Sequence, residues 1–210
     1  MANLESLLND LANLDAQHDL EGMRRIREQI VSLHPNSEAA VEALYKIGLD
    51  HLFRLRQLPQ AVERFAEAAS RKHPFWSAAA RTSLGLCYYH QRRMQKALFE
   101  LRKVGYPDKA TVHSVTALAF IEQIYGNEGK PDEAQRVRKD RISQLEALIQ
   151  DAREAGQSQE RGFHLYTLGL ALKDHTEERR AKAVLEEAKA LGPDVLGADL
   201  YRSVLEAIDL

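Results

Sequence analysis

The chain has 210 residues, of which 44% are hydrophobic and 29% are charged, a composition that excludes wholesale disorder and permits a sizeable core. Its 29 lysines and arginines are interspersed with 31 aspartates and glutamates, which argues against a broad nucleic-acid-binding face. The single cysteine, Cys87, excludes an internal disulfide, and no cysteine–histidine spacing is typical of a zinc site.

The N-terminal sequence has neither the basic region nor the apolar region of a secretory signal. The longest apolar runs anywhere in the chain are far shorter than the about 20 residues that a membrane-spanning helix requires. We therefore expect a cytoplasmic protein that does not insert into a membrane.

Apolar residues recur at intervals of three and four along almost the whole chain, a pattern that predicts helices. The first helix is expected around Leu4–Leu14, and a second ends before His34-Pro35, because the residue before a proline disfavours helical geometry. Asn36-Ser37 is expected to cap a third helix that runs to about Arg54. About eight further helices are expected, at 58–73, 76–90, 94–104, 111–125, 132–155, 160–173, 177–190 and 194–208.

Three of these segments, 44–49, 83–89 and 166–172, have closely similar sequences. Each is followed by a second segment with apolar residues at helical spacing that include an alanine. These are Ala61, Phe65 and Ala68, then Ala97 and Leu101, and then Ala181, Leu185 and Ala188. Self-similarity of this length predicts a solenoid, in which stacked helix pairs share a continuous core.

The pattern resembles the tetratricopeptide repeat, a pair of helices of about 34 residues. The motif residues are clearest at Leu84-Gly85, Ala97 and Leu101, and again at Leu168-Gly169 and Ala181. The resemblance implies an all-α, right-handed superhelix formed by one domain, 1–210. Its expected repeats and capping helix are 3–36, 38–74, 76–107, 112–156, 160–193 and 194–208.

Glycine inside a helix costs about 1 kcal/mol relative to alanine, so Gly48, Gly85 and Gly169 need a compensating contact. We expect the alanines of the paired helix to face these glycines and to allow a close approach. The fourth repeat departs from the pattern. It has Glu122 where a small residue is expected, and its second helix is overlong at about 24 residues, or about 36 Å.

In tetratricopeptide repeats the first helix of each pair lines a concave surface that holds ligand peptides. The resemblance places apolar, aromatic and a few polar side chains on that surface. They are Tyr45, Leu49, Leu52, Phe53, Thr82, Leu86, Tyr89, His90, Gln123, Phe163, Tyr166, Leu170 and Lys173. Such a groove suits an amphipathic helix or an extended hydrophobic segment. Leu49 and Leu86 are equally compatible with burial between helices.

Two segments allow more than one interpretation. The basic run Arg136, Arg138, Lys139 and Arg141 is typical of a solvated helix face, but it also suits an acidic partner or a homodimer contact. The final helix, 194–208, either caps the array or folds back into the groove.

The sequence shows no arrangement that indicates catalysis. No two of the eight histidines have the helical spacing and the neighbouring carboxylate of a metal site. Cys87 is expected to pack in the core, and Gly126–Gly129 is expected to form a turn between helices. We therefore expect no catalytic residue, no metal and no cofactor.

The predicted function is that of a non-catalytic adaptor, chaperone or assembly scaffold that binds a hydrophobic peptide or an amphipathic helix of a protein partner. Two alternatives remain open at the level of sequence. The chain could self-associate, as a homodimer for example, or it could be a regulatory subunit whose helices rearrange when a ligand binds.

Overall fold

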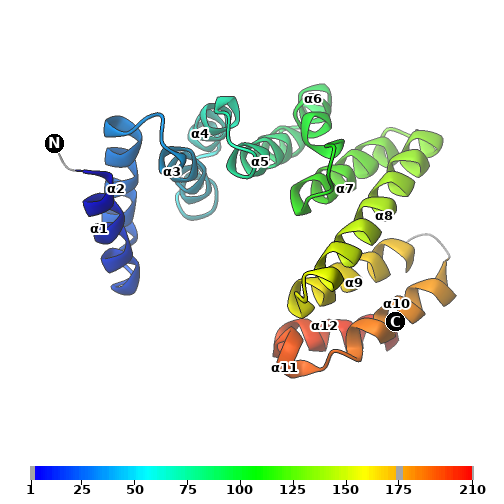
Figure 1. Ribbon diagram of the computed structural model, residues 1–210. Coiled ribbons are helices and arrows are strands. Elements are labelled where there is room, and N and C mark those ends of the chain that lie inside the picture. Colours follow the sequence, from blue (N-terminus) through cyan, green and yellow to red (C-terminus); the bar gives the residue numbers. More distant parts are fainter. Residues whose placement is uncertain (1–2, 174–176, 210) are drawn as a thin grey trace. The chain divides into compact units, whose positions relative to one another are not determined.

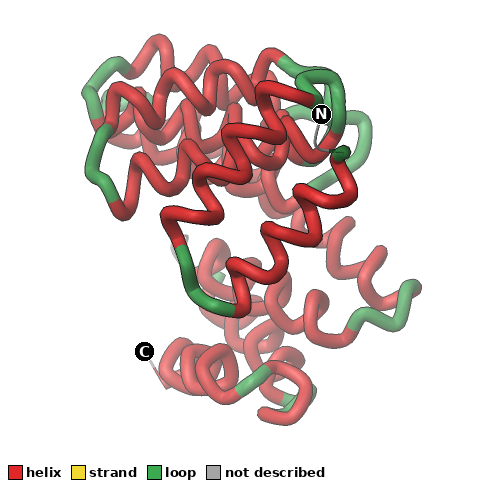
Figure 2. The backbone as a smooth tube through the Cα atoms, turned by 90° about the vertical axis from the view of Figure 1, so that its left-hand side faces the viewer, coloured by secondary structure: helices red, strands yellow, loops and turns green. Residues whose placement is uncertain are grey.

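The computed structural model describes residues 3–173 and 177–208 with their side chains, and the backbone of residue 209. These residues form twelve α-helices and one π-helical turn, connected by short loops, with no strand among them (Figures 1 and 2). The contacts divide the chain into two compact units, residues 1–104 and 105–210, which are described separately below.

The first unit contains three helix pairs and the π-helical turn η1, and its last helix ends at the boundary residue Gly105. The elements are α1 (Leu4–Ala16), α2 (Leu20–Leu33), α3 (Glu38–Leu49), η1 (Asp50–Arg54), α4 (Leu58–Ser70), α5 (Trp76–His90) and α6 (Met94–Gly105). The second unit contains two pairs and two terminal helices. Its elements are α7 (Val112–Asn127), α8 (Pro131–Glu154), α9 (Ser158–Lys173), α10 (Glu178–Lys189), α11 (Pro193–Leu196) and α12 (Ala198–Asp209).

Helix boundaries follow local signals in the sequence. The backbone N–H of Ala40 donates to Ser37 Oγ at 3.1 Å, so Ser37 is the N-cap of α3. Thr111 and Ser114 form a reciprocal capping box at the start of α7. Each predicted helix before residue 194 is present, and the third continues from α3 through η1 to Arg54.

Helices that follow one another in the sequence share a core, as a solenoid requires. In the first unit, Leu7, Ile30 and Ala43 join α1, α2 and α3 in one buried cluster. In the second unit, a larger cluster includes Leu145 and Leu165 and extends through α10 to the terminal helices. Each pair of helices thus buries its apolar face mainly against its sequence neighbours.

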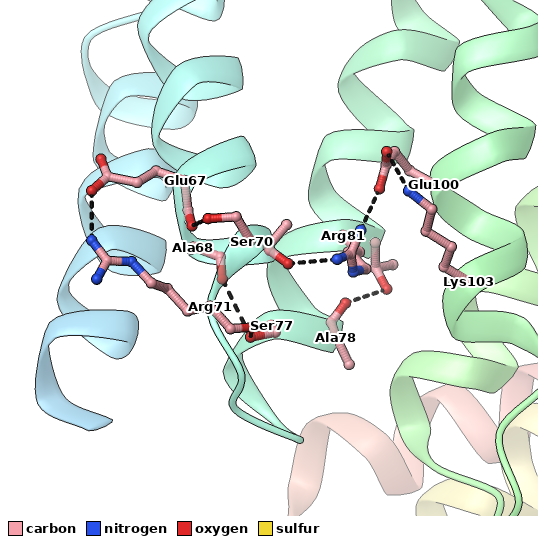
Figure 3. Close-up of polar contacts among 11 residues, drawn as sticks. Glu67, Ala68, Ser70, Arg71, Ser77, Ala78, Arg81, Glu100 and Lys103 are labelled. Atoms are coloured by element: carbon pink, nitrogen blue, oxygen red, sulfur yellow. Dashed lines mark hydrogen bonds and ion pairs between the residues drawn. The ribbon is translucent and has the colours of Figure 1, made fainter. Parts of the chain in front are cut away.

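Polar contacts also connect successive pairs (Figure 3). Arg81 on α5 donates to the carbonyl oxygen of Ala69 at 2.7 Å and to Glu100 Oε2 on α6 at 2.8 Å. The buried hydroxyl of Ser77 donates to the carbonyl oxygen of Arg71 at 2.7 Å. These bonds satisfy carbonyl groups at the C-terminal end of α4 that have no partner within the helix.

The mid-helix glycines do allow a close approach, and the nearest atoms at each belong to a large side chain of the paired helix. A Cβ at Gly48 would lie 2.6 Å from the Phe65 ring, and one at Gly85 would lie 2.6 Å from Leu101 Cγ. A Cβ at Gly169 would lie 2.5 Å from Leu185 Cγ. The large residue four positions after each alanine therefore packs on the glycine. One turn of helix separates these positions, so the same face of the second helix carries both.

The predicted helix at 194–208 is in fact two helices. Gly197 has φ of 78°, a left-handed conformation that glycine adopts without strain, and it separates α11 from α12. Leu196 is buried on α11 and lies against Gly162 of α9. α12 packs against both helices of the preceding pair, α9 and α10.

His164 on α9 makes stability pH-dependent. The side chain is buried, and this burial lowers its pKa below the usual 6.5, with Glu160 opposing the shift. As the pH falls below about 6.5, the unfolded chain takes up a proton that the folded chain excludes. We expect the melting temperature to decrease from about pH 7.5 to about pH 5.5. The decrease should be smaller in His164→Gln, and an identical decrease in both proteins would contradict this role.

Candidate partner-binding surface

Most of the predicted groove residues of the second repeat are partly buried. Tyr45, Leu49 and Leu52 pack against the core cluster that contains Phe65. The Tyr45 ring lies between two aromatic rings, with centroid distances of 5.9 Å to Phe65 and 5.6 Å to Trp76. These three side chains are thus only partly available to a partner.

Phe53 differs from these neighbours because its side chain is 73% exposed. It belongs to η1, where the backbone forms a π-helical turn before the connection to α4. The sequence signal for this turn is a spacing of 13 residues between Gly48 and Ala61, whereas the two equivalent spacings in later repeats are 12. The extra residue is accommodated in the turn and its loop, and Phe53 lies at the surface.

The third repeat contributes surface of mixed character. Thr82 is buried, and its hydroxyl donates to the carbonyl oxygen of Ala78 within α5, so it offers little surface. Leu86 and Tyr89 are partly buried. His90 is exposed at the end of α5, with its ring centroid 5.6 Å from that of Tyr89.

In the second unit, α9 carries four of the predicted groove residues, and three of them are large apolar or aromatic side chains. Phe163 is 50% exposed and Leu170 is 38% exposed. Tyr166 lies between them in sequence and packs partly against the core cluster of this unit. Spacings of three and four residues place all three side chains in one row along the helix. Lys173, at the end of α9, donates to the carbonyl oxygen of Ala207 and thereby fixes α12.

Gln123 is exposed on α7, at the edge of a hollow of about 470 Å³ between α7 and α8. The hollow contains an ionic cluster that the sequence interpretation did not identify. Glu122 accepts from Arg138 Nε at 2.9 Å, and its other carboxylate oxygen lies 3.1 Å from Arg141 Nη2. The signal in the sequence was Glu122 itself, at a position where three of the other repeats have Gly48, Gly85 and Gly169.

The basic run on α8 is therefore divided between two environments. Arg138 and Arg141 are directed toward α7, whereas Arg136 and Lys139 are exposed. The interpretation of the run as a solvated face holds for the second pair alone. Side chains three positions apart share a helix face, which explains why the first pair reaches the same carboxylate.

Among the described residues, two features would indicate a catalytic site, a reactive cysteine and a metal-binding cluster. Cys87 is buried beside Phe65 and Leu84, and burial raises the pKa of its thiol to about 11. At neutral pH the thiol is therefore protonated and packs as a small apolar side chain. Within the described ranges, no three histidine, cysteine, aspartate or glutamate side chains are grouped as metal ligands. No helix in the same ranges has the length and apolar character needed to cross a bilayer.

No protein-family model and no curated protein sequence matches the chain. Among solved structures, it is similar to a Podosopora anserina putative kinesin light chain with nearly identical TPR-like repeats. The Q17M form of that protein has a TM-score of 0.55 at 14% identity, with 91% of this chain and 95% of that chain covered. A second structure of these repeats has a TM-score of 0.54 at 14% identity, with 93% and 97% covered.

A structure of MamA protein is also similar, with a TM-score of 0.50 at 18% identity and with 97% of this chain and 90% of that chain covered. Similarity at these identities concerns the fold. The chain is an all-α protein with the fold of tetratricopeptide-type repeats, which confirms the resemblance inferred from its sequence.

Proposed function

We propose that this protein is a non-catalytic interaction module, an adaptor or assembly scaffold, that binds a hydrophobic or amphipathic segment of a partner protein. The observation that carries the proposal is the row of Phe163, Tyr166 and Leu170 on α9, with its two outer residues well exposed. Large apolar side chains in a row give an amphipathic helix a face against which to pack.

The first helices of the other repeats support the same function. Phe53 is the most exposed large hydrophobic residue of the described chain, and it follows the partly buried Tyr45, Leu49 and Leu52 in the sequence of α3 and η1. A tyrosine in such a position can keep its hydroxyl in water while its ring contacts a partner. The repeat fold also supports the proposal, because stacked helix pairs present an extended binding surface.

The proposal is tested with peptides selected from a displayed library against the intact wild-type protein. We expect Phe163→Ala/Leu170→Ala to weaken binding of the selected peptides about tenfold or more, because a few large side chains carry most interface energy. The matched control is Phe99→Ala on α6, which truncates a side chain that is 61% exposed outside the predicted surface. Equal affinity of the double variant and the wild type would contradict the proposal.

Sedimentation of the same proteins separates partner binding from self-association. A concentration-dependent mass in the wild type that is lost in Phe163→Ala/Leu170→Ala would show that the α9 face binds a second copy of the chain. A constant monomer mass in both proteins would exclude that alternative. Circular dichroism should show equal helicity in all variants, since the substituted side chains lie at the surface.

A further inference from the structure

The helix pair α7/α8 departs at one defined position from the packing that α3/α4, α5/α6 and α9/α10 share. Glu122 lies 12 residues before Ala134, as Gly85 lies 12 residues before Ala97. Arg138 lies four residues after Ala134, at the position where Leu101 and Leu185 cover their glycines in two other repeats. An apolar contact at this position is therefore replaced by an ion pair.

This ion pair is largely sheltered from water. The side chains of Glu122, Arg138 and Arg141 are 12%, 22% and 13% exposed. Replacement of a buried ion pair by well-packed apolar residues is often neutral or stabilising, because charges are costly to desolvate. The glycine and leucine of the neighbouring repeats show that this fold accepts the apolar alternative here. Stability alone thus does not account for the charges.

The part of the overlong α8 that holds Arg138 and Arg141 precedes the part that packs in the core shared with α9. α8 has 24 residues, whereas the second helices α6 and α10 have 12 each. α9 starts after the C-terminal end of α8 and packs beside its later turns (Figure 1). The α8 residues in the core shared with α9 are Ile142, Leu145 and Ile149, all beyond Arg141. The residues that line the hollow come from α7 and α8 alone.

The arginines retain donor capacity inside the hollow. Each guanidinium has five N–H donors, and one nitrogen of each meets the Glu122 carboxylate within 3.1 Å. Arg141 Nε is buried with no hydrogen-bond partner, a costly state for a charged group. Two guanidinium groups and one carboxylate leave one net positive charge. The side-chain amides of Gln123 and Asn127 also line the space.

We propose that this hollow binds a carboxylate, the side chain of an aspartate or glutamate in a partner polypeptide. The net charge of +1 matches a carboxylate, whereas a phosphate dianion would leave excess negative charge in a sheltered site. Arginine forks match the planar carboxylate geometry, and Phe120 and Ala119 provide an apolar wall for the methylene groups. The inference rests on the proposed function, because Gln123 belongs to the predicted partner-facing surface of α7.

The test uses N-acetylglutamate methylamide as the probe, with the neutral glutamine analogue and inorganic phosphate as comparisons. The full chain is titrated while the side-chain Nε–H signals of arginine are followed by nuclear magnetic resonance. We expect the glutamate probe to shift the signals of Arg138 and Arg141 and the glutamine analogue to leave them unchanged. Arg141→Gln should lower the affinity for the probe about tenfold, since the loss of one charge-assisted hydrogen bond changes an affinity by about that factor.

Glu122→Gln is a second variant, and we expect it to strengthen binding of the probe where Arg141→Gln weakens it. It removes the Glu122 charge that competes with the probe for the arginines and raises the local charge to +2. We therefore expect the affinity for the probe to rise by about threefold or more. The matched controls Arg136→Gln and Lys139→Gln remove exposed charges from the same helix and should leave binding unchanged. Circular dichroism and melting temperature check that each variant is folded.

Several outcomes would overturn the inference. Equal shifts with the glutamine analogue, stronger binding of phosphate, equal losses in Arg136→Gln and Arg141→Gln, or unchanged binding in Glu122→Gln would each do so. None of these results bears on the α9 face, which is tested separately by Phe163→Ala/Leu170→Ala. Failure of the α9 test together with carboxylate binding here would reject the proposed peptide surface and retain the carboxylate site.

Discussion

Phe65→Ala is expected to destabilise the protein by about 3–5 kcal/mol, the usual cost of deleting a fully buried aromatic ring. The Phe65 side chain has no exposed surface, and its ring fills the space above Gly48 and contacts the core around Leu84. Because glycine has no side chain that could move into the vacated volume, the cavity should collapse poorly. Urea unfolding followed by circular dichroism measures the loss as a lower midpoint at an unchanged slope.

Phe53→Ala is the matched control, since it deletes the same atoms from a side chain that is 73% exposed. We expect this variant to lie within about 0.5 kcal/mol of the wild type. Similar losses in the two variants would show that the ring of Phe65 does not fill the space that the structure assigns to it.

The second large effect concerns the pair Gly85 and Leu101. Gly85→Ala alone should destabilise by about 1–3 kcal/mol, because the new Cβ would lie 2.6 Å from Leu101 Cγ and 2.7 Å from its Cδ2. This clash outweighs the gain in helix propensity of about 1 kcal/mol. Leu101→Ala alone should cost about 2–5 kcal/mol.

The double variant Gly85→Ala/Leu101→Ala should lose less than the sum of the two single losses. Truncation of Leu101 removes the atoms with which the new Cβ would clash, and the added methyl group occupies part of the cavity. Coupling between contacting residues typically amounts to about 0.5–3 kcal/mol. Additive losses would contradict direct packing of Leu101 on Gly85.

Gly126→Ala is the control for which we expect no loss of stability, because a Cβ at that position in α7 would meet no atom within 4 Å. We expect it to be neutral or to stabilise by up to about 1 kcal/mol through helix propensity. A loss comparable with that of Gly85→Ala would show that helix glycines are constrained here by something other than neighbouring side chains.

The candidate surface was predictable only in part. Helical register placed Phe163, Tyr166 and Leu170 on one face of one helix, and the structure places them there. The same register could not predict that Thr82 is buried by neighbouring elements while Phe53 is exposed at a π-helical turn. The sequence also could not predict the ion-pair partners of Glu122, because they depend on which side of α8 packs against α7.

The sequence by itself determined the number of helix pairs, their approximate ends and the positions of close approach. These features depend on local signals: the periodicity of apolar residues, the caps, the prolines and the glycines. Tertiary structure alone decided that Leu101 and Leu185 make the nearest contacts with their glycines, that Gly197 divides the terminal segment, and that a charged hollow lies between α7 and the overlong α8. The physical reason is that helical periodicity specifies which residues share a face, whereas the element that covers that face depends on contacts between segments distant in the chain.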